Sequence, residues 1–224
     1  MRSEFEDQLN DLHVRFAEMS MMVNETIKKS VNSFLNHDKK MAQQVIDDDQ
    51  KINNREMDLE KRSFELIALQ QPVTTDLRMI VTVLKASSDL ERMGDHSVSV
   101  ARATLEMKDV ERIPAVEKQI KEVAQEVERT FSEAIDAYIR NDDHSAIDIA
   151  KNDDNIDKMI SKINRTCIEA MKDNKETVEG GTSYILVANY IERMGDYVTN
   201  LCEWIVYLRR GKLYDLNTKN PDAE

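Results

Sequence analysis

Apolar residues recur every three or four positions along most of the chain, which is the spacing of one face of an α-helix. The pattern first predicts a helix over 5–34, with the stripe Phe5, Leu9, Leu12, Phe16, Met19, Val23, Ile27, Val31 and Phe34. A second helix is expected over 38–69, because Asp38 suits an N-cap and Pro72 ends helical geometry. A third helix is expected over 74–108.

The same pattern then starts again. It predicts a fourth helix over 116–138, a fifth and continuous helix over 146–168, and a sixth over 182–210. Residues 173–181 contain the adjacent glycines Gly180 and Gly181 and are predicted to form a loop. Each half of the chain therefore contains three long helices.

The two halves also align residue by residue. The motif Glu91-Arg92-Met93-Gly94-Asp95 returns unchanged at 192–196, 101 positions later. Asp49 and Ile52 match Asp153 and Ile156 at an offset of 104. We therefore predict an all-α fold of two tandem, internally duplicated three-helix bundles. The expected divisions are 1–110 for the first repeat, 113–211 for the second and 212–224 for a flexible tail, with the boundary near 108–115.

Composition narrows the class of protein. Five glycines, three prolines and 33% charged residues in 224 are typical of long helices. The net charge of −12 repels phosphate backbones, which argues against nucleic acid as a ligand. No apolar run has the length of a membrane span, and Cys167 and Cys202 lack CxxC spacing. The sequence thus predicts a soluble, cytoplasmic protein with reduced cysteines.

The repeated motif sets two carboxylates four residues apart, about one helical turn. Two like charges at this spacing cost a few tenths of a kcal/mol, and a glycine within a helix costs about 1 kcal/mol relative to alanine. The chain accepts both costs in each copy of the motif. A metal, a basic partner or inheritance from a duplicated ancestor would each explain this.

Carboxylates on two adjacent helices would form a site of hard oxygen ligands, suited to Mg²⁺, Mn²⁺, Ca²⁺ or iron. The candidate metal ligands are Glu91, Asp95, Glu192, Asp196, Asp49 and Asp153. Alternatively, Arg92 and Arg193 neutralise these acids without a metal. No ExxH pair accompanies them, which argues against a ferritin-like di-iron oxidase. Nor does the chain contain a nucleophile elbow, a phosphate-binding loop or a catalytic triad, so we expect no enzymatic activity.

Together these motifs resemble the PhoU family. The resemblance rests on the two ExxxD motifs, on residues 72–78 (Pro-Val-Thr-Thr-Asp-Leu-Arg) and on the Asp49/Ile52 pattern, and covers residues 5–210. It implies two similar three-helix bundles. It also implies metal ions such as iron, manganese, magnesium or zinc at the ExxxD helices. The family often has asparagine four residues after the motif aspartate; Asn200 fits this pattern, and Ser99 does not.

The resemblance further implies a cytoplasmic negative regulator of phosphate uptake and of the phosphate-starvation response. Such a protein is an adaptor between the ATPase subunit of the phosphate ABC transporter and a sensor histidine kinase. It forms a homodimer and meets the membrane only through these partners. The alternatives are a metal-binding helical protein with a storage or enzymatic role, and a purely structural helical scaffold.

Overall fold

The computed structural model describes residues 2–107 and 111–216. These residues form α-helices and one short 3-10 helix, with no β-strand among them. The elements in chain order are α1 (Arg2–Asn36), α2 (Lys39–Gln70), α3 (Thr74–Glu106), α4 (Pro114–Arg140), α5 (Asp143–Ala150), α6 (Asp153–Asp173), η1 (Lys175–Thr177) and α7 (Val178–Arg210). No described helix combines the length and apolar character that crossing a membrane requires.

The helix ends follow local chemistry that the sequence contains. Asp38 caps α2, because its side-chain Oδ1 accepts a hydrogen bond of 2.9 Å from the N–H of Met41. Asp142 caps α5 in the same way, at 3.0 Å from the N–H of Ser145. These two caps are 104 residues apart, so the duplication extends to the turns between helices.

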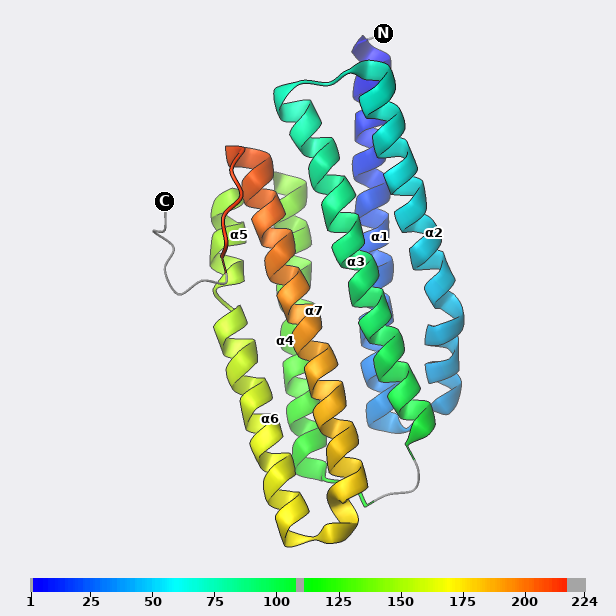
Figure 1. Ribbon diagram of the computed structural model, residues 1–224, viewed down its shortest axis with the longest axis vertical. Helices are drawn as coiled ribbons and strands as arrows, with labels where there is room; N and C mark the ends of the chain where they lie inside the picture. Colours follow the sequence, from blue (N-terminus) through cyan, green and yellow to red (C-terminus); the bar gives the residue numbers. More distant parts are fainter. Residues whose placement is uncertain (1, 108–110, 217–224) are drawn as a thin grey trace.

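The two bundles lie side by side with their helices roughly parallel to one long axis (Figure 1). The first bundle contains α1, α2 and α3, and the second contains α4, α5, α6 and α7. Contacts of α1 with α4 and of α3 with α7 join them. Most buried apolar side chains of both bundles belong to a single cluster, so the repeats share one core.

The prediction of a continuous fifth helix is wrong. The helix breaks at Lys151 and Asn152, between α5 and α6. The side-chain amide of Asn152 donates hydrogen bonds to Glu126 and Thr130 of α4, at 2.8 and 2.9 Å. The backbone carbonyl of Asn152 accepts a 2.9 Å hydrogen bond from the backbone N–H of Asn155, in the first turn of α6. A polar side chain that bonds to a neighbouring helix thus interrupts an otherwise periodic apolar stripe.

The predicted loop over 173–181 is also wrong in its second half. The 3-10 turn η1 leads directly into α7, and Gly180 and Gly181 are buried in the first turn of that helix. A Cβ atom at Gly181 would lie 2.8 Å from Cγ of Met171 in α6. The glycine therefore permits close packing of α7 on α6, and it does not form a flexible turn.

The expected boundary and tail lie partly outside the described residues. The third helix ends at Glu106. Its predicted end at Lys108, and part of the boundary expected near 108–115, lie in the undescribed stretch 108–110. Of the tail predicted over 212–224, residues 217–224 are likewise outside. The backbone N–H of Leu216 donates a 2.8 Å hydrogen bond to Glu203 of α7, so the described part of the tail contacts the helix.

Candidate functional site

The two copies of the Glu-Arg-Met-Gly-Asp motif lie in α3 and α7, the last helix of each bundle. In α3, a Cβ atom at Gly94 would lie 3.3 Å from Cδ1 of Ile52 in α2. In α7, a Cβ atom at Gly195 would lie 3.3 Å from Cδ1 of Ile156 in α6. Glycine thus lets the motif helix approach its neighbour closely, and this approach places the motif acids against the acids of α2 and α6.

The first acidic cluster consists of Glu91, Asp95 and Asp49, with Glu56 nearby. Glu91 and Asp95 border the core, and their side chains are 25% and 46% exposed. Asp49 faces them from α2. Its Oδ2 accepts a hydrogen bond of 3.2 Å from Asn53, whereas its Oδ1 is buried and has no hydrogen-bond partner. A buried carboxylate oxygen without a partner is costly, because it has lost its hydration.

Electrostatics shows that these carboxylates act on one another. Burial raises the pKa of Glu91, and the charges of Asp95, Glu56 and Asp49 raise it further. Burial also raises the pKa of Asp49, to which the charge of Asp95 adds. The acids of α2 and α3 are therefore close enough to repel one another, as the sequence predicts for a shared site.

The second acidic cluster consists of Glu192, Asp196, Asp153 and Asp157, from α6 and α7. Burial, followed by the charges of Asp157 and Asp196, raises the pKa of Asp153 to about 6. Burial raises the pKa of Glu192 as well, again with contributions from Asp157 and Asp196. The hydroxyl of Thr199 donates a 3.4 Å hydrogen bond to Asp153, which offsets only part of the repulsion.

The motif arginines offset part of the charge of each cluster. Arg92 Nη1 lies 3.7 Å from Asp95 Oδ2, and Arg193 Nη1 donates a 3.1 Å hydrogen bond to Asp196 Oδ2. Both arginine side chains are more than half exposed, and ion pairs at exposed positions contribute less than about 1 kcal/mol. Burial still raises the pKa of Asp196, despite the opposing charge of Arg193.

The donor chemistry of both clusters suits a hard cation, because every candidate ligand is a carboxylate oxygen. The partnerless Oδ1 of Asp49 is the kind of atom that a cation would satisfy. In the described part of the chain, however, no three His, Cys, Asp or Glu side chains converge on one point. A cation at either cluster therefore requires side-chain rotamers other than those in this structure.

Comparison with known proteins identifies the family. The family model described as "PhoU domain" matches the chain twice, over residues 16–104 and 120–205. The chain belongs to the PhoU family.

Relatives and solved structures of this family match nearly the whole chain. A protein of Streptococcus pneumoniae strain TIGR4, named phosphate-specific transport system accessory protein PhoU homolog, is 34% identical over 97% of this chain and 100% of its own length. A Clostridium acetobutylicum protein of the same name is 33% identical over 96% and 99%. The crystal structure of the phosphate transport system regulatory protein PhoU from Streptococcus pneumoniae superimposes with a TM-score of 0.89, at 32% identity over 94% of this chain and 99% of that one. The crystal structure of PhoU from Pseudomonas aeruginosa superimposes with a TM-score of 0.87, at 27% identity over 93% of this chain and 100% of that one.

Each PhoU domain contains one acidic cluster. The first match includes Asp49, Glu91 and Asp95, and the second includes Asp153, Glu192 and Asp196. The structure places each predicted set of three on two adjacent helices, without the three side chains converging on one point. Whether the clusters hold a metal stays a prediction.

The sequence does not show that α3 and α7, which contain the two motifs, pack against each other along a seam between the two PhoU domains. His96, next to Asp95, lies between α3 and α7 with its ring centroid 5.9 Å from that of Tyr190 and 5.8 Å from that of Tyr197. Burial lowers the pKa of His96, and charges of both motifs act on it, Asp95 and Asp196 raising the pKa and Arg193 and Arg92 lowering it. An alignment of the halves shows that His96 and Tyr197 are equivalent, yet it does not show that they touch.

A second contact between α3 and α7 involves Asn200, the residue equivalent to Ser99. The side-chain amide of Asn200 lies 3.5 Å from Asp89 of the other PhoU domain, and the indole N–H of Trp204 donates to Asp89 at 3.1 Å. Asn200 therefore joins the domains in this structure. Ser99 instead donates to the backbone carbonyl of Asp95, within α3.

Proposed function

We propose that this protein is a cytoplasmic, non-enzymatic negative regulator of phosphate uptake and of the phosphate-starvation response. It acts as a homodimeric adaptor between the ATPase subunit of the phosphate ABC transporter and a sensor histidine kinase. It lowers the output of the kinase when phosphate is plentiful, and it reaches the membrane only through these partners.

The observation that carries this proposal is the match to PhoU proteins over nearly the full length, in sequence and in fold. The names of the relatives describe an accessory protein of the phosphate-specific transport system. Two bundles of long helices also offer extended faces on which partner helices can dock. The acidic surface, with a net charge of −12, suits protein partners better than phosphate itself.

The experiment that tests the adaptor role is a bridging assay. The cytoplasmic part of the organism's phosphate-sensing kinase is immobilised, and the purified transporter ATPase subunit is added with or without this protein. We expect the ATPase to be retained only when this protein is present. Retention of neither this protein nor the ATPase would overturn the proposal. Light scattering on the same preparation is expected to give the mass of two chains.

A second candidate function, binding of a divalent cation, is favoured by the clustered carboxylates and by the partnerless oxygen of Asp49. We propose that Glu91, Asp95 and Asp49 hold one ion, and that Glu192, Asp196 and Asp153 hold another. Such an ion would neutralise charges that the folded chain otherwise keeps close together. This proposal predicts that manganese(II) raises the melting temperature of the wild type more than that of an Asp153→Asn variant.

A further inference from the structure

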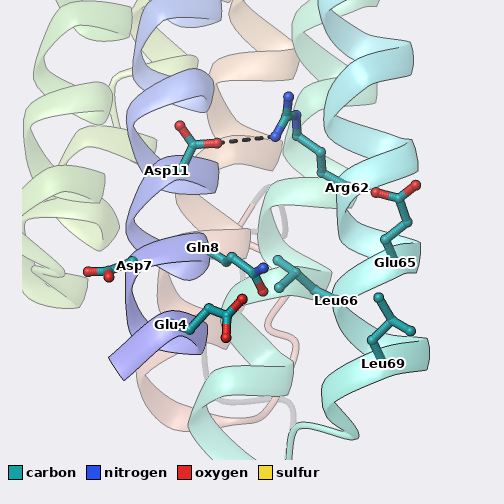
Figure 2. A pocket seen from close by; sticks show the side chains of 8 residues that line it. All are labelled: Glu4, Asp7, Gln8, Asp11, Arg62, Glu65, Leu66 and Leu69. Atoms are coloured by element: carbon teal, nitrogen blue, oxygen red, sulfur yellow. Dashed lines mark hydrogen bonds and ion pairs between the residues drawn. The ribbon is translucent and has the colours of Figure 1, made fainter. Parts of the chain in front are cut away.

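A groove between α1 and α2 lies near the start of α1 and the end of α2, away from both acidic clusters. Its volume is about 360 Å³. Leu66 forms the buried floor at 6% exposure, and Leu69 stands beside it at 78% exposure. Glu4 and Glu65 extend from the two helices beside this apolar centre, and Asp7 also lines the groove, with its carboxylate directed away from the two leucines (Figure 2).

The duplication does not account for this groove. At the offset of 104, the start of α4 at Pro114 corresponds to position 10, whereas α1 begins at Arg2. The first two turns of α1, which contribute Glu4 and Asp7, therefore have no helical equivalent in α4. The counterparts of Leu66 and Leu69 in the second repeat are Ala170 and Asp173, so the apolar centre is also missing there.

The charge of the groove is one-sided. Glu4, Asp7 and Glu65 are exposed on its rim, and Asp11 lies deeper. Among the described side chains that line the groove, the cation is Arg62, whose Nη1 lies 3.3 Å from Asp11 (Figure 2). Its Nε lies 2.8 Å from Asp58.

Arg62 is also part of a larger network. Asp11 and Asp58 each contact Arg15 as well, at 2.7 and 3.3 Å. This alternating arrangement of two acids and two arginines keeps the guanidinium of Arg62 engaged between α1 and α2. The rim carboxylates therefore present net negative charge around exposed leucine.

We propose that this groove binds a basic amphipathic segment of a partner protein. An apolar side chain of the segment packs on Leu66 and Leu69, and lysines or arginines beside it pair with the rim carboxylates. Charge complementarity selects this occupant, because the rim repels anionic lipid surfaces and a second copy of this acidic chain. The inference rests on the proposed adaptor function, since it gives one of the two partners a docking site.

The first test uses a defined probe, a fluorescent helical peptide of about 18 residues with leucine at helical spacing and lysine elsewhere. Binding is measured by anisotropy at about 0.15 M salt, which screens weak surface attraction. The groove variant is Leu69→Asp/Glu65→Lys. The control, Ile139→Asp/Glu169→Lys, changes charge identically at an exposed isoleucine and at the counterpart of Glu65. We expect the groove variant to bind at least tenfold more weakly than the wild type and the control. Equal binding by all three proteins would overturn the proposal.

The second test repeats the comparison with the transporter ATPase subunit and the cytoplasmic part of the kinase. Loss of one partner by the groove variant alone supports the proposal. Wild-type affinity of the groove variant for both partners would overturn it while the adaptor function stands. If the wild type binds neither partner, the adaptor function fails, and the peptide measurement still decides whether the groove is a basic-peptide site.

Discussion

Replacement of Gly195 by valine is expected to lower the free energy of unfolding by about 3 kcal/mol. A Cβ atom at this position already lies 3.3 and 3.4 Å from two carbons of Ile156, and valine adds two more carbons in the same space. The better helix propensity of valine offsets only a few tenths of a kcal/mol. For a chain of this size the melting temperature should fall by about 6–12 °C, as measured by circular dichroism.

Alanine at the same position provides the control. It adds only the Cβ atom, and the gain of about 1 kcal/mol in helix propensity opposes the tight contact, so its melting temperature should stay near that of the wild type. The equivalent substitution Gly94→Val should behave like Gly195→Val, because Gly94 meets Ile52 in the same way. A Gly195→Val protein as stable as the wild type would show that α7 does not pack closely against α6 at this glycine.

Asp153→Asn is expected to stabilise the metal-free protein at pH 7. Burial and neighbouring carboxylates raise the pKa of Asp153 from 3.8 to about 6, so ionising it in the folded state costs free energy. The shift corresponds to about 3 kcal/mol, and screening of a partly exposed group reduces the expected gain to about 1–2 kcal/mol. The sign sets the pH dependence. The folded chain binds the carboxyl proton of Asp153 more tightly than the unfolded chain does. The free energy of unfolding of the wild type therefore falls as pH rises from about 4 to 6, and this fall is smaller in the variant.

The same variant separates a cation site from a general charge effect. At a manganese(II) concentration of about 100 times the dissociation constant, binding stabilises the folded state by about 2.7 kcal/mol. We expect this gain in the wild type, a smaller one in Asp153→Asn, and the full gain in the control Asp148→Asn, whose side chain is 74% exposed. Equal shifts in all three proteins, or none in any, would contradict the proposed site.

Much of the fold follows from local sequence, because apolar periodicity and capping act over a few residues. The stripe of α1, the cap at Asp38 and the end of α2 at Gln70, just before Pro72, are of this kind. Aligning the halves shows that Asp49, Glu91 and Asp95 are equivalent to Asp153, Glu192 and Asp196. Both Cys167 and Cys202 are free and buried, as their isolation in the sequence predicts.

What the sequence did not reveal depends on contacts between distant residues. The break before α6 requires Asn152 to bond to α4, and periodicity carries no sign of that contact. Gly180 and Gly181 have the composition of a turn, but tight packing on Met171 places them in a helix. The seam at His96 and the Asp89–Trp204 hydrogen bond arise from docking of one repeat on the other, which similarity between the repeats does not specify.

The groove and the clusters also differ in how they relate to the duplication. Both repeats contain an acidic cluster, so inheritance from a duplicated ancestor could have kept it. Among the described residues the groove belongs to the first repeat, since α4 begins at Pro114 and lacks the two turns that contain Glu4 and Asp7 in α1. An adaptor must distinguish two partners, and such an asymmetric surface is one way to do so.

The most direct test of the proposed function is the level of alkaline phosphatase, or of another phosphate-repressed output, in a deletion strain grown with excess phosphate. A negative regulator predicts high output despite plentiful phosphate, and restored repression when the wild-type protein is supplied. Output that stays repressed in the deletion strain would contradict the regulatory role.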